Sequence, residues 1–121
     1  MSRKFTDDHE WIDLDGNIAT IGITDFAAAQ LGDVVFVEQP NIGDIFSKGD
    51  ACAVVESTKA ASDVYAPLSG TILEVNNEIV DNPALVNDST EDKAWFFKIE
   101  MKNNDELNAL MDAEAYKKHI G

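Results

Sequence analysis

The sequence predicts a mainly β fold, a small β-sandwich or flattened barrel with a short helix near residue 27 and helices at its C-terminal end. Short runs rich in Val, Ile and Phe alternate with turn residues along most of the chain, and a helical pattern is limited to two places. The 121 residues are enough to bury one apolar core. We therefore expect a single domain over 1–121, with a helical extension at about 104–119.

The predicted strands are short, and turn residues separate each of them from the next. Between the first two strands, Asp15-Gly16-Asn17 is a strong signal for a tight turn and predicts a hairpin. The strands are expected over residues 9–14, 18–23, 34–38, 45–47, 51–56, 63–66, 71–75 and 95–100.

Two segments predict helices. Thr24 can cap a short helix over residues 25–31, and Gly32 can end it. In the tail, Asn104 or Asp105 can cap a second helix, because both side chains accept hydrogen bonds from main-chain N–H groups of a first turn. The packed face of this second helix would carry Leu107, Leu110 and Met111.

The charge of the chain limits its partners. There are 23 acidic and 9 basic residues, which gives a formal net charge of −14. Binding to phosphates needs a basic stripe, and the sequence has none, so it argues against nucleic acid and against an anionic membrane surface. The acidic surface either steers the protein toward basic rims on partner proteins or only keeps it in solution.

The chain offers few residues for catalysis. Cys52 is the only cysteine, so neither an internal disulfide nor a cysteine cluster for zinc can form. Cys52 is interpreted as a packed side chain in an apolar run, with a reactive thiol as the alternative. His9 and His119 are the only histidines, and neither has a recognisable nucleophile partner. We expect neither an enzyme nor a metal site.

One segment is set apart by a single lysine in a predicted hairpin. An apolar strand enters from Ala51, small and polar residues surround Lys59, and a second strand leaves toward Pro67. A lysine at a hairpin tip projects its amine away from the main chain, and its small neighbours leave it open to a modifying enzyme. An exposed lysine in a turn is usually only a solvated charge, so this geometry leaves both interpretations open. The small or polar neighbours are Ser57, Thr58, Ala60 and Ala61.

The run from Glu56 to Ala60 that contains Lys59, followed by Asp63 and Pro67, resembles the lipoyl-attachment motif of the glycine cleavage H-protein family. Lipoyl domains of 2-oxo acid dehydrogenases usually carry Asp before the lysine, and biotin carriers flank it with Met, so Thr58 fits these families less well. Further similarities follow in the same order along nearly the whole chain. They are His9-Glu10-Trp11, Gly22-Ile23-Thr24, residues 31–37, Pro40, Gly43, Gly70, Glu74-Val75-Asn76, Pro83, Leu85, Asn87, Trp95, Lys98, Leu110-Met111 and Tyr116.

The resemblance implies a fold of the lipoyl-domain type, the barrel-sandwich hybrid, and a carrier without catalytic activity. It implies lipoic acid bound as an amide to Lys59. The implied partners are glycine dehydrogenase (decarboxylating), aminomethyltransferase and dihydrolipoyl dehydrogenase, between which the carrier shuttles the aminomethyl group of glycine and presents its dithiol. A lipoate–protein ligase or a lipoyl/octanoyl transferase would attach the group. The alternatives are an H-like protein that relays or stores lipoyl groups, and an acidic β-rich binding module whose lysine is unmodified.

The resemblance also implies roles for individual acids. Glu10 and Asp63 are candidates for pairing with the protonated amine of the loaded arm, and Glu56 is a candidate for recognition by the ligase. The alternative for Glu10 is a solvated strand residue, and for Asp63 a side chain that stabilises a turn. The chain departs from the family at Asp8, where many relatives carry Ser, and at Phe26, where many carry His. The loop over residues 88–94 also lacks the usual Pro and Gly.

The N-terminal sequence has neither the apolar stretch of a signal peptide nor the composition of a transit peptide. We expect the cytoplasm of a bacterium, with the mitochondrial matrix as the alternative for a mature eukaryotic form.

Overall fold

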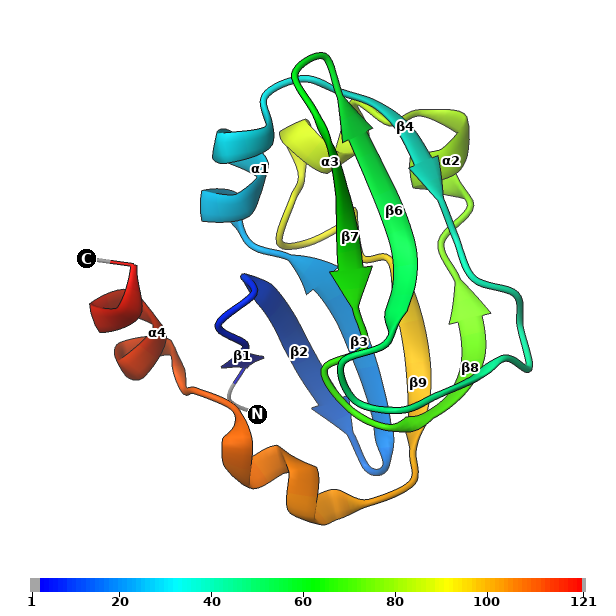
Figure 1. Cartoon of the computed structure of the whole chain (residues 1–121), viewed down its shortest axis with the longest axis vertical. Coiled ribbons are helices and arrows are strands. Elements are labelled where there is room, and N and C mark those ends of the chain that lie inside the picture. The colour runs from blue at the N-terminus through cyan, green and yellow to red at the C-terminus, as the bar shows by residue number, and fades with distance from the viewer. Residues whose placement is uncertain (1–2, 121) are drawn as a thin grey trace.

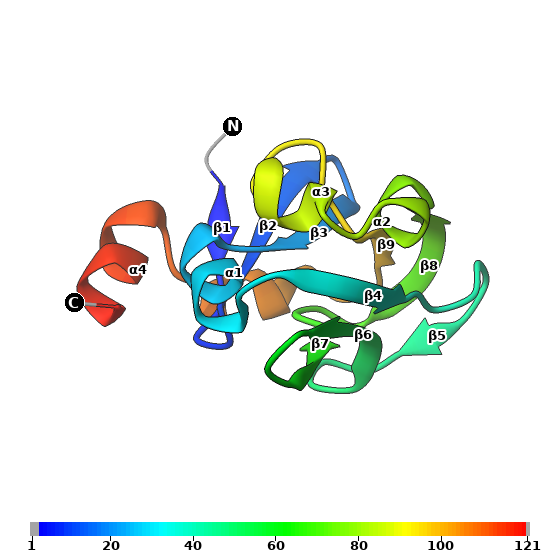
Figure 2. The same cartoon turned by 90° about the horizontal axis from the view of Figure 1, so that it is seen from above.

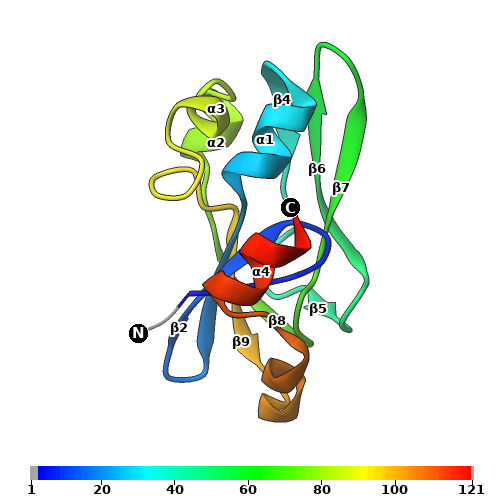
Figure 3. The ribbon, with the colours of Figure 1, turned by 90° about the vertical axis from the view of Figure 1, so that its left-hand side faces the viewer.

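A computed structural model describes residues 3–120 and consists of two antiparallel sheets on opposite sides of a shared core (Figures 1 and 3). The larger sheet has the order β1 (Lys4–Phe5), β2 (Glu10–Asp15), β3 (Ile18–Ile23), β9 (Phe97–Met101), β8 (Gly70–Val75) and β5 (Ile45–Phe46). The smaller sheet has the order β4 (Val34–Glu38), β6 (Ala51–Ser57) and β7 (Ala61–Tyr65). The helices are α1 (Asp25–Leu31), α2 (Glu78–Asp81), α3 (Leu85–Asp88), the 3₁₀ helix η1 (Asn104–Ala109) and α4 (Ala113–His119).

The inner faces of the two sheets meet in one apolar core, as alternation along antiparallel strands predicts. β2 is buried on both faces, because Ile12 points into this core while Trp11 packs in a smaller cluster with Phe5 and Tyr116. That second cluster fastens the tail to the N-terminal strands. The core side chains from the two sheets that are fully buried include Ile12, Ile21, Val37, Val55, Val64, Ile72, Phe97 and Ile99.

The predicted mainly β architecture is confirmed, and so are most of its local signals. β2 and β3 form the predicted hairpin, with Gly16 in the left-handed region at φ 62°. The Thr24 side chain caps α1 by accepting the N–H of Ala27, and Gly32 follows the helix at φ 81°. Both ends of α1 are therefore determined by the residues that the sequence indicated.

The C-terminal segment differs from the prediction. Asn103 caps the first helix in place of Asn104 or Asp105, and that helix is a 3₁₀ helix that ends at Ala109. Leu110 and Met111 lie beyond it in extended chain, where Met111 pairs with Phe5 through two main-chain hydrogen bonds of 2.8 Å. This pairing to β1 interrupts the expected helix and gives two short helices. Asp112 then caps α4.

The last strand begins at Phe97, two residues later than predicted. The side chain of Asn76 explains the delay, because it donates hydrogen bonds to the main-chain oxygens of Lys93 (2.9 Å) and Trp95 (2.8 Å) and so takes the place of a neighbouring strand there. The short elements β1, α2 and α3 were not predicted, since two to four residues show no periodicity. No helix within residues 3–120 is long and apolar enough to cross a membrane.

Candidate functional site

Lys59 lies in the tight turn between β6 and β7, at one end of the molecule (Figure 1). Ser57 holds the turn in shape: its hydroxyl oxygen accepts the N–H groups of Lys59 and Ala60, both at 3.1 Å, and its own N–H donates to the oxygen of Ala60 at 2.8 Å. Ser57 and Ala60 thus satisfy most of the main-chain groups of the turn locally. The Lys59 side chain is exposed, as the sequence predicts.

The turn is also attached to the segment between α1 and β4. The N–H of Thr58 donates to the oxygen of Asp33 at 3.0 Å. A Cβ placed on Gly32 would lie 3.3 Å from Cε of Lys59, so glycine leaves room there for the lysine stem. Asn87 supports this segment from α3, because its amide donates to the oxygen of Gly32 (2.8 Å) and accepts the N–H of Val34 (2.8 Å). The α3 region, which opens the loop that departs from the family, therefore helps to hold the lysine hairpin.

A hollow of about 160 Å³ lies beside this hairpin, between α1, the start of β2 and the strands β6 and β7. We refer to it as the hairpin hollow. Its apolar walls suit an aliphatic chain, and its carboxyl groups suit a positively charged end. The apolar side chains are Ile23, Ala27, Leu31, Val55 and Val64, and the acids are Asp8, Glu10 and Asp63.

Glu10 is buried, with only 2% of its surface exposed, so its interpretation as a solvated strand residue is wrong. The N–H of Tyr65 donates to its Oε2 at 2.8 Å, and the hydroxyl of Thr6 donates to its Oε1 at 3.1 Å. Burial raises the pKa of Glu10 to about 8, since the two hydrogen bonds only partly offset the loss of hydration. The carboxyl is therefore mainly neutral at pH 7 while no cation lies beside it.

The other predicted acids occupy different positions. Asp63 lies on β7, is exposed and lines the hairpin hollow together with Glu10, 53 positions away in the sequence. Within residues 3–120 its carboxylate accepts no hydrogen bond, which does not favour a role in stabilising a turn. Glu56 is half-buried on β6, opposite Ala61 and outside the hairpin hollow.

Two positions at which the sequence departs from the family lie close to this site. Asp8 lines the hollow, whereas Phe26 packs its ring on His9 with centroids 4.7 Å apart.

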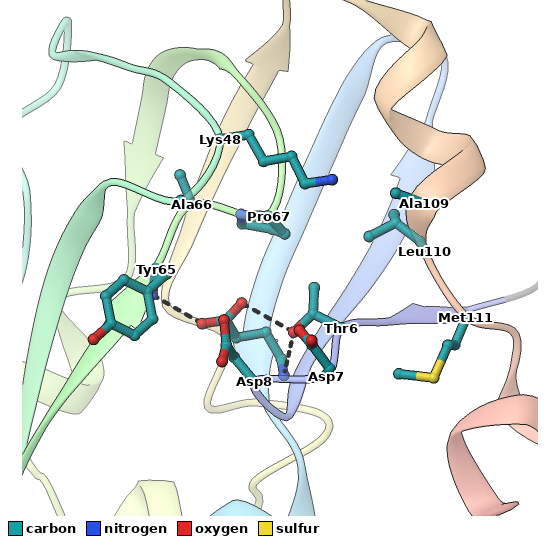
Figure 4. Close-up of a pocket in the computed structure, with 12 residues that line it drawn as sticks. Thr6, Asp7, Asp8, Lys48, Tyr65, Ala66, Pro67, Ala109, Leu110 and Met111 are labelled. Atoms are coloured by element: carbon teal, nitrogen blue, oxygen red, sulfur yellow. Dashed lines mark hydrogen bonds between the residues drawn. The ribbon is translucent and has the colours of Figure 1, made fainter. Parts of the chain in front are cut away.

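A second, larger hollow of about 480 Å³ also has Glu10 in its lining. Figure 4 shows Thr6, Tyr65 and Leu110 around it. It opens between the turn at Lys48 and Gly49, which precedes β6, and the tail at Leu110 and Met111. Glu10 and Asp8 line both hollows, so they form the partition between them. Only 2% of the surface of Glu10 is exposed, but a ligand in either hollow would lie next to this residue.

One polar cluster, which involves the tail, is not predicted by the sequence. The Tyr116 hydroxyl lies 2.8 Å from Nδ1 of His9 and 2.7 Å from Oγ1 of Thr24. The ring of His119 lies 5.8 Å from that of His9, and burial together with this second imidazole lowers the pKa of His9. His9 adopts φ 67°, an unusual value outside glycine, which turns its side chain toward α4. The 107 positions between His9 and Tyr116 carry no local signal of this contact.

No group of three or more His, Cys, Asp or Glu side chains within residues 3–120 is arranged to hold a metal ion. Cys52 is half-buried at the edge of the apolar core, and burial raises the pKa of its thiol to about 12. A thiol with so high a pKa is largely protonated and a weak nucleophile at neutral pH. Packing is the role that these two observations support.

Comparison with known proteins decides the family. The model of the family described as glycine cleavage H-protein matches residues 3–121. The chain belongs to this family. A glycine cleavage system H protein from Bradyrhizobium diazoefficiens is 56% identical over 115 residues, which cover 95% of this chain and 94% of that protein. The H protein of Carboxydothermus hydrogenoformans is 53% identical over 115 residues, which cover 95% of this chain and 88% of that protein.

A solved structure agrees with this assignment. The crystal structure of a glycine cleavage system H protein from Mycobacterium marinum matches with a TM-score of 0.89 at 38% identity, over 99% of this chain and 97% of that one. The predicted barrel-sandwich fold of the lipoyl-domain type is thereby confirmed. An H protein is a carrier component of the glycine cleavage system and not one of its catalytic subunits, and its family carries lipoate.

Proposed function

We propose that this chain is the lipoyl-bearing carrier of a glycine cleavage system, with the lipoyl group bound as an amide to Nζ of Lys59. The supporting observation is the position of Lys59, exposed in a tight turn beside a hollow that combines apolar walls with three carboxyl groups. When bound, the lipoyl group supplies a disulfide that takes up the aminomethyl group of glycine at the decarboxylase, yields it at the aminomethyltransferase and is reoxidised by dihydrolipoyl dehydrogenase. The residues described below bind, orient and shield the arm.

The lining of the hairpin hollow fits such an arm in polarity. Ile23, Leu31 and Val64 offer apolar contact to an aliphatic chain, and Ser57 holds the turn so that the arm starts from a defined place. Gly32 leaves space for the lysine stem. A bound arm would therefore exchange water contact for apolar contact along its length.

Glu10 and Asp63 bind the protonated amine of the loaded arm. An ammonium group beside Glu10 favours the carboxylate over the neutral acid, so docking lowers the pKa of Glu10 from about 8 and releases its proton. A hydrogen bond to a charged group in such a partly dry site contributes about 1.5 to 3 kcal/mol. Asp63 adds a second, more exposed negative charge, which contributes less because water screens it.

Glu56 is the residue that a modifying enzyme recognises. It lies three positions before Lys59 at the end of β6, with its side chain half-buried. A lipoate–protein ligase would activate lipoic acid with ATP as lipoyl-AMP and release pyrophosphate. The neutral amine Nζ of Lys59 would then attack the lipoyl carbonyl, displace AMP and lose one proton as the amide forms. A basic surface on that enzyme would pair with Glu56 and hold the turn in register.

The relatives named above are bacterial, and on that basis we place the carrier in the bacterial cytoplasm, where it serves glycine catabolism and one-carbon metabolism. The expected partners are glycine dehydrogenase (decarboxylating), aminomethyltransferase and dihydrolipoyl dehydrogenase. We treat residues 1–121 as one carrier domain.

The test is the mass of the purified chain after incubation with lipoate–protein ligase, lipoic acid and ATP, followed by turnover with the three partner enzymes and glycine. We expect one lipoyl increment, located on the peptide with Lys59, and glycine-dependent turnover. Lys59→Arg is the control: it keeps the charge and the fold, and it should show neither increment nor turnover. A chain that stays unmodified would be an acidic binding module. A modified chain without turnover would instead be a relay or store of lipoyl groups.

A further inference from the structure

An open apolar groove of about 520 Å³ is lined by residues of β4, the segment that follows it and α2. The elements α2 and β4 are in contact and lie next to each other in Figure 2. We call this groove the β4 groove. Its exposed apolar side chains are Ile42, Phe36 and Val80, with 66%, 45% and 40% of their surface in contact with solvent. Val75 and Pro40 complete its apolar lining. None of these residues lines the hairpin hollow, so the carrier chemistry does not explain them.

The groove is part of the folded framework. The amide of Gln39 donates to the main-chain oxygens of Phe96 (2.8 Å) and Asn76 (3.2 Å), which holds the end of β4 against the larger sheet. The irregular register between Val34 and Phe36 leaves both Val35 and Phe36 exposed, where strict alternation would bury one of them. Large apolar side chains that gather in one hollow mark an interaction site more often than single exposed ones do.

The charges around the groove indicate the chemistry of its occupant. Glu38 lies in the groove, Glu78 and Asp81 are carried by α2, and Asp44 follows the loop. Residues 34–44 and 77–81 contain no Lys or Arg. An apolar centre with an acidic rim fits a partner segment that has an apolar side chain flanked by Lys or Arg. A second copy of this chain fits poorly, because it would bring the same acids against each other.

The groove is also coupled to the lysine hairpin through the ladder between β4 and β6. Phe36 lies directly opposite Glu56, and Val34 opposite Ser57, so Phe36 is one rung from the strand end that leads to Lys59. Opposed side chains of such a pair lie about 5 Å apart. The five residues of β4 span about 17 Å, and an ordinary interface covers a patch of about 800 Å² on each partner, roughly 16 Å in radius. A protein that covers Lys59 therefore also reaches Phe36, at the end of the groove nearest to the hairpin.

This geometry separates the partners. An enzyme that acts on the end of the loaded arm can bind at a distance from Lys59, because the arm spans that distance. The enzyme that attaches the arm has to enclose Nζ of Lys59 itself and must lie on the hairpin and on the strand beside it. We propose that the β4 groove is the docking surface for the lipoyl-attaching enzyme, which inserts an apolar side chain flanked by basic residues next to Phe36. This inference rests on the proposed function, because it requires that Lys59 is modified.

The test compares Phe36→Gln and Ile42→Gln with Ile45→Gln, a matched control on β5 that is 71% exposed and lies outside the groove. The affinity of each unmodified chain for lipoate–protein ligase is measured by titration calorimetry, and the rate of lipoylation by mass spectrometry. We expect both groove variants to raise Kd and KM at least tenfold with little change in kcat, and the control to stay within twofold of wild type. Ile42 lies in a loop, so its variant remains informative if Phe36→Gln unfolds.

The outcomes distinguish the two proposals. Groove variants that bind and react like wild type, while wild type is lipoylated normally, overturn the docking surface and leave the carrier function in place. Variants that lose turnover with the decarboxylase but keep normal lipoylation assign the groove to another partner and also overturn the inference. A dimer of the wild type that Phe36→Gln dissociates, seen by sedimentation, would do the same. A wild-type chain that is never modified would remove the proposed function first.

Discussion

The main-chain N–H of Tyr65 donates a 2.8 Å hydrogen bond to Oε2 of Glu10, across 55 positions of sequence. This bond joins β7, which leaves the lysine hairpin, to the first residue of β2. It places a carboxyl group with 2% exposure at the partition between the two hollows. The position of the hairpin and the protonation of Glu10 are therefore linked, and the consequences can be measured.

The stability of the chain should depend on pH through Glu10. Its pKa is about 8 in the folded chain and 4.5 without the fold, so between these values the folded state binds more protons. The contribution of Glu10 to the free energy of unfolding is fully present below about pH 4.5 and is lost as the pH rises through about 8. Glu10→Gln cannot ionise, so its free energy of unfolding should rise relative to that of wild type by about 4 kcal/mol between pH 5 and pH 9, measured by urea unfolding. An equal difference at both pH values would mean that Glu10 is ionised throughout.

The loaded carrier should decay faster without Glu10. If its carboxylate pairs with the docked ammonium, Glu10→Gln should shorten the lifetime of the loaded form about tenfold, because 1.4 kcal/mol corresponds to a factor of ten. Asp63→Asn should have a smaller effect, since Asp63 is exposed. The decay is followed by mass or by release of ammonia. Lipoylation and reoxidation of the dithiol serve as controls and should barely change. Equal decay in Glu10→Gln and wild type would remove Glu10 from the pairing.

Recognition by the ligase should depend on the charge of Glu56. Glu56→Gln keeps the size of the side chain, so we expect lipoylation at low salt to slow severalfold while the unfolding temperature is nearly unchanged. The difference should shrink as salt is added, because counterions screen a partly exposed charge contact. Lipoylation rates measured across a range of ionic strength test this. A difference that salt leaves constant would point to shape and not to charge.

The tail should loosen when the Tyr116 hydroxyl is removed. Tyr116→Phe keeps the ring that stacks on Phe5, with centroids 4.6 Å apart, but loses the contacts to His9 and Thr24. Leaving these polar groups without their partner should cost about 1 to 3 kcal/mol and speed amide hydrogen exchange in α4. Lys117→Ala, an exposed change on the same helix, should stay within about 0.5 kcal/mol of wild type. Unchanged exchange in Tyr116→Phe would show that stacking alone holds α4.

Much of the local structure could be predicted because its causes are local. Thr24 and Gly32 determine both ends of α1 through a side-chain cap and a positive φ, and Gly16 determines a hairpin turn. Lys59 was expected in an open turn, and the structure has it exposed there, because small neighbours and the Ser57 hydroxyl shape the turn locally, even though Thr58 also bonds to Asp33. The family could also be identified from the sequence, since its lipoyl-attachment motif is one contiguous run of residues.

Other features were decided only by tertiary structure, because they depend on residues far apart in the sequence. The sequence left Glu10 open between a solvated and a pocket residue; its burial follows from Thr6 and from Tyr65 on another sheet. The predicted tail helix breaks because Met111 pairs with Phe5, a contact that no local propensity encodes. The sequence by itself thus determined the strands, the turn around Lys59 and the acidic charge. The packing of the two sheets decided which acids line the hairpin hollow, because burial and its effect on pKa exist only once distant strands exclude water together.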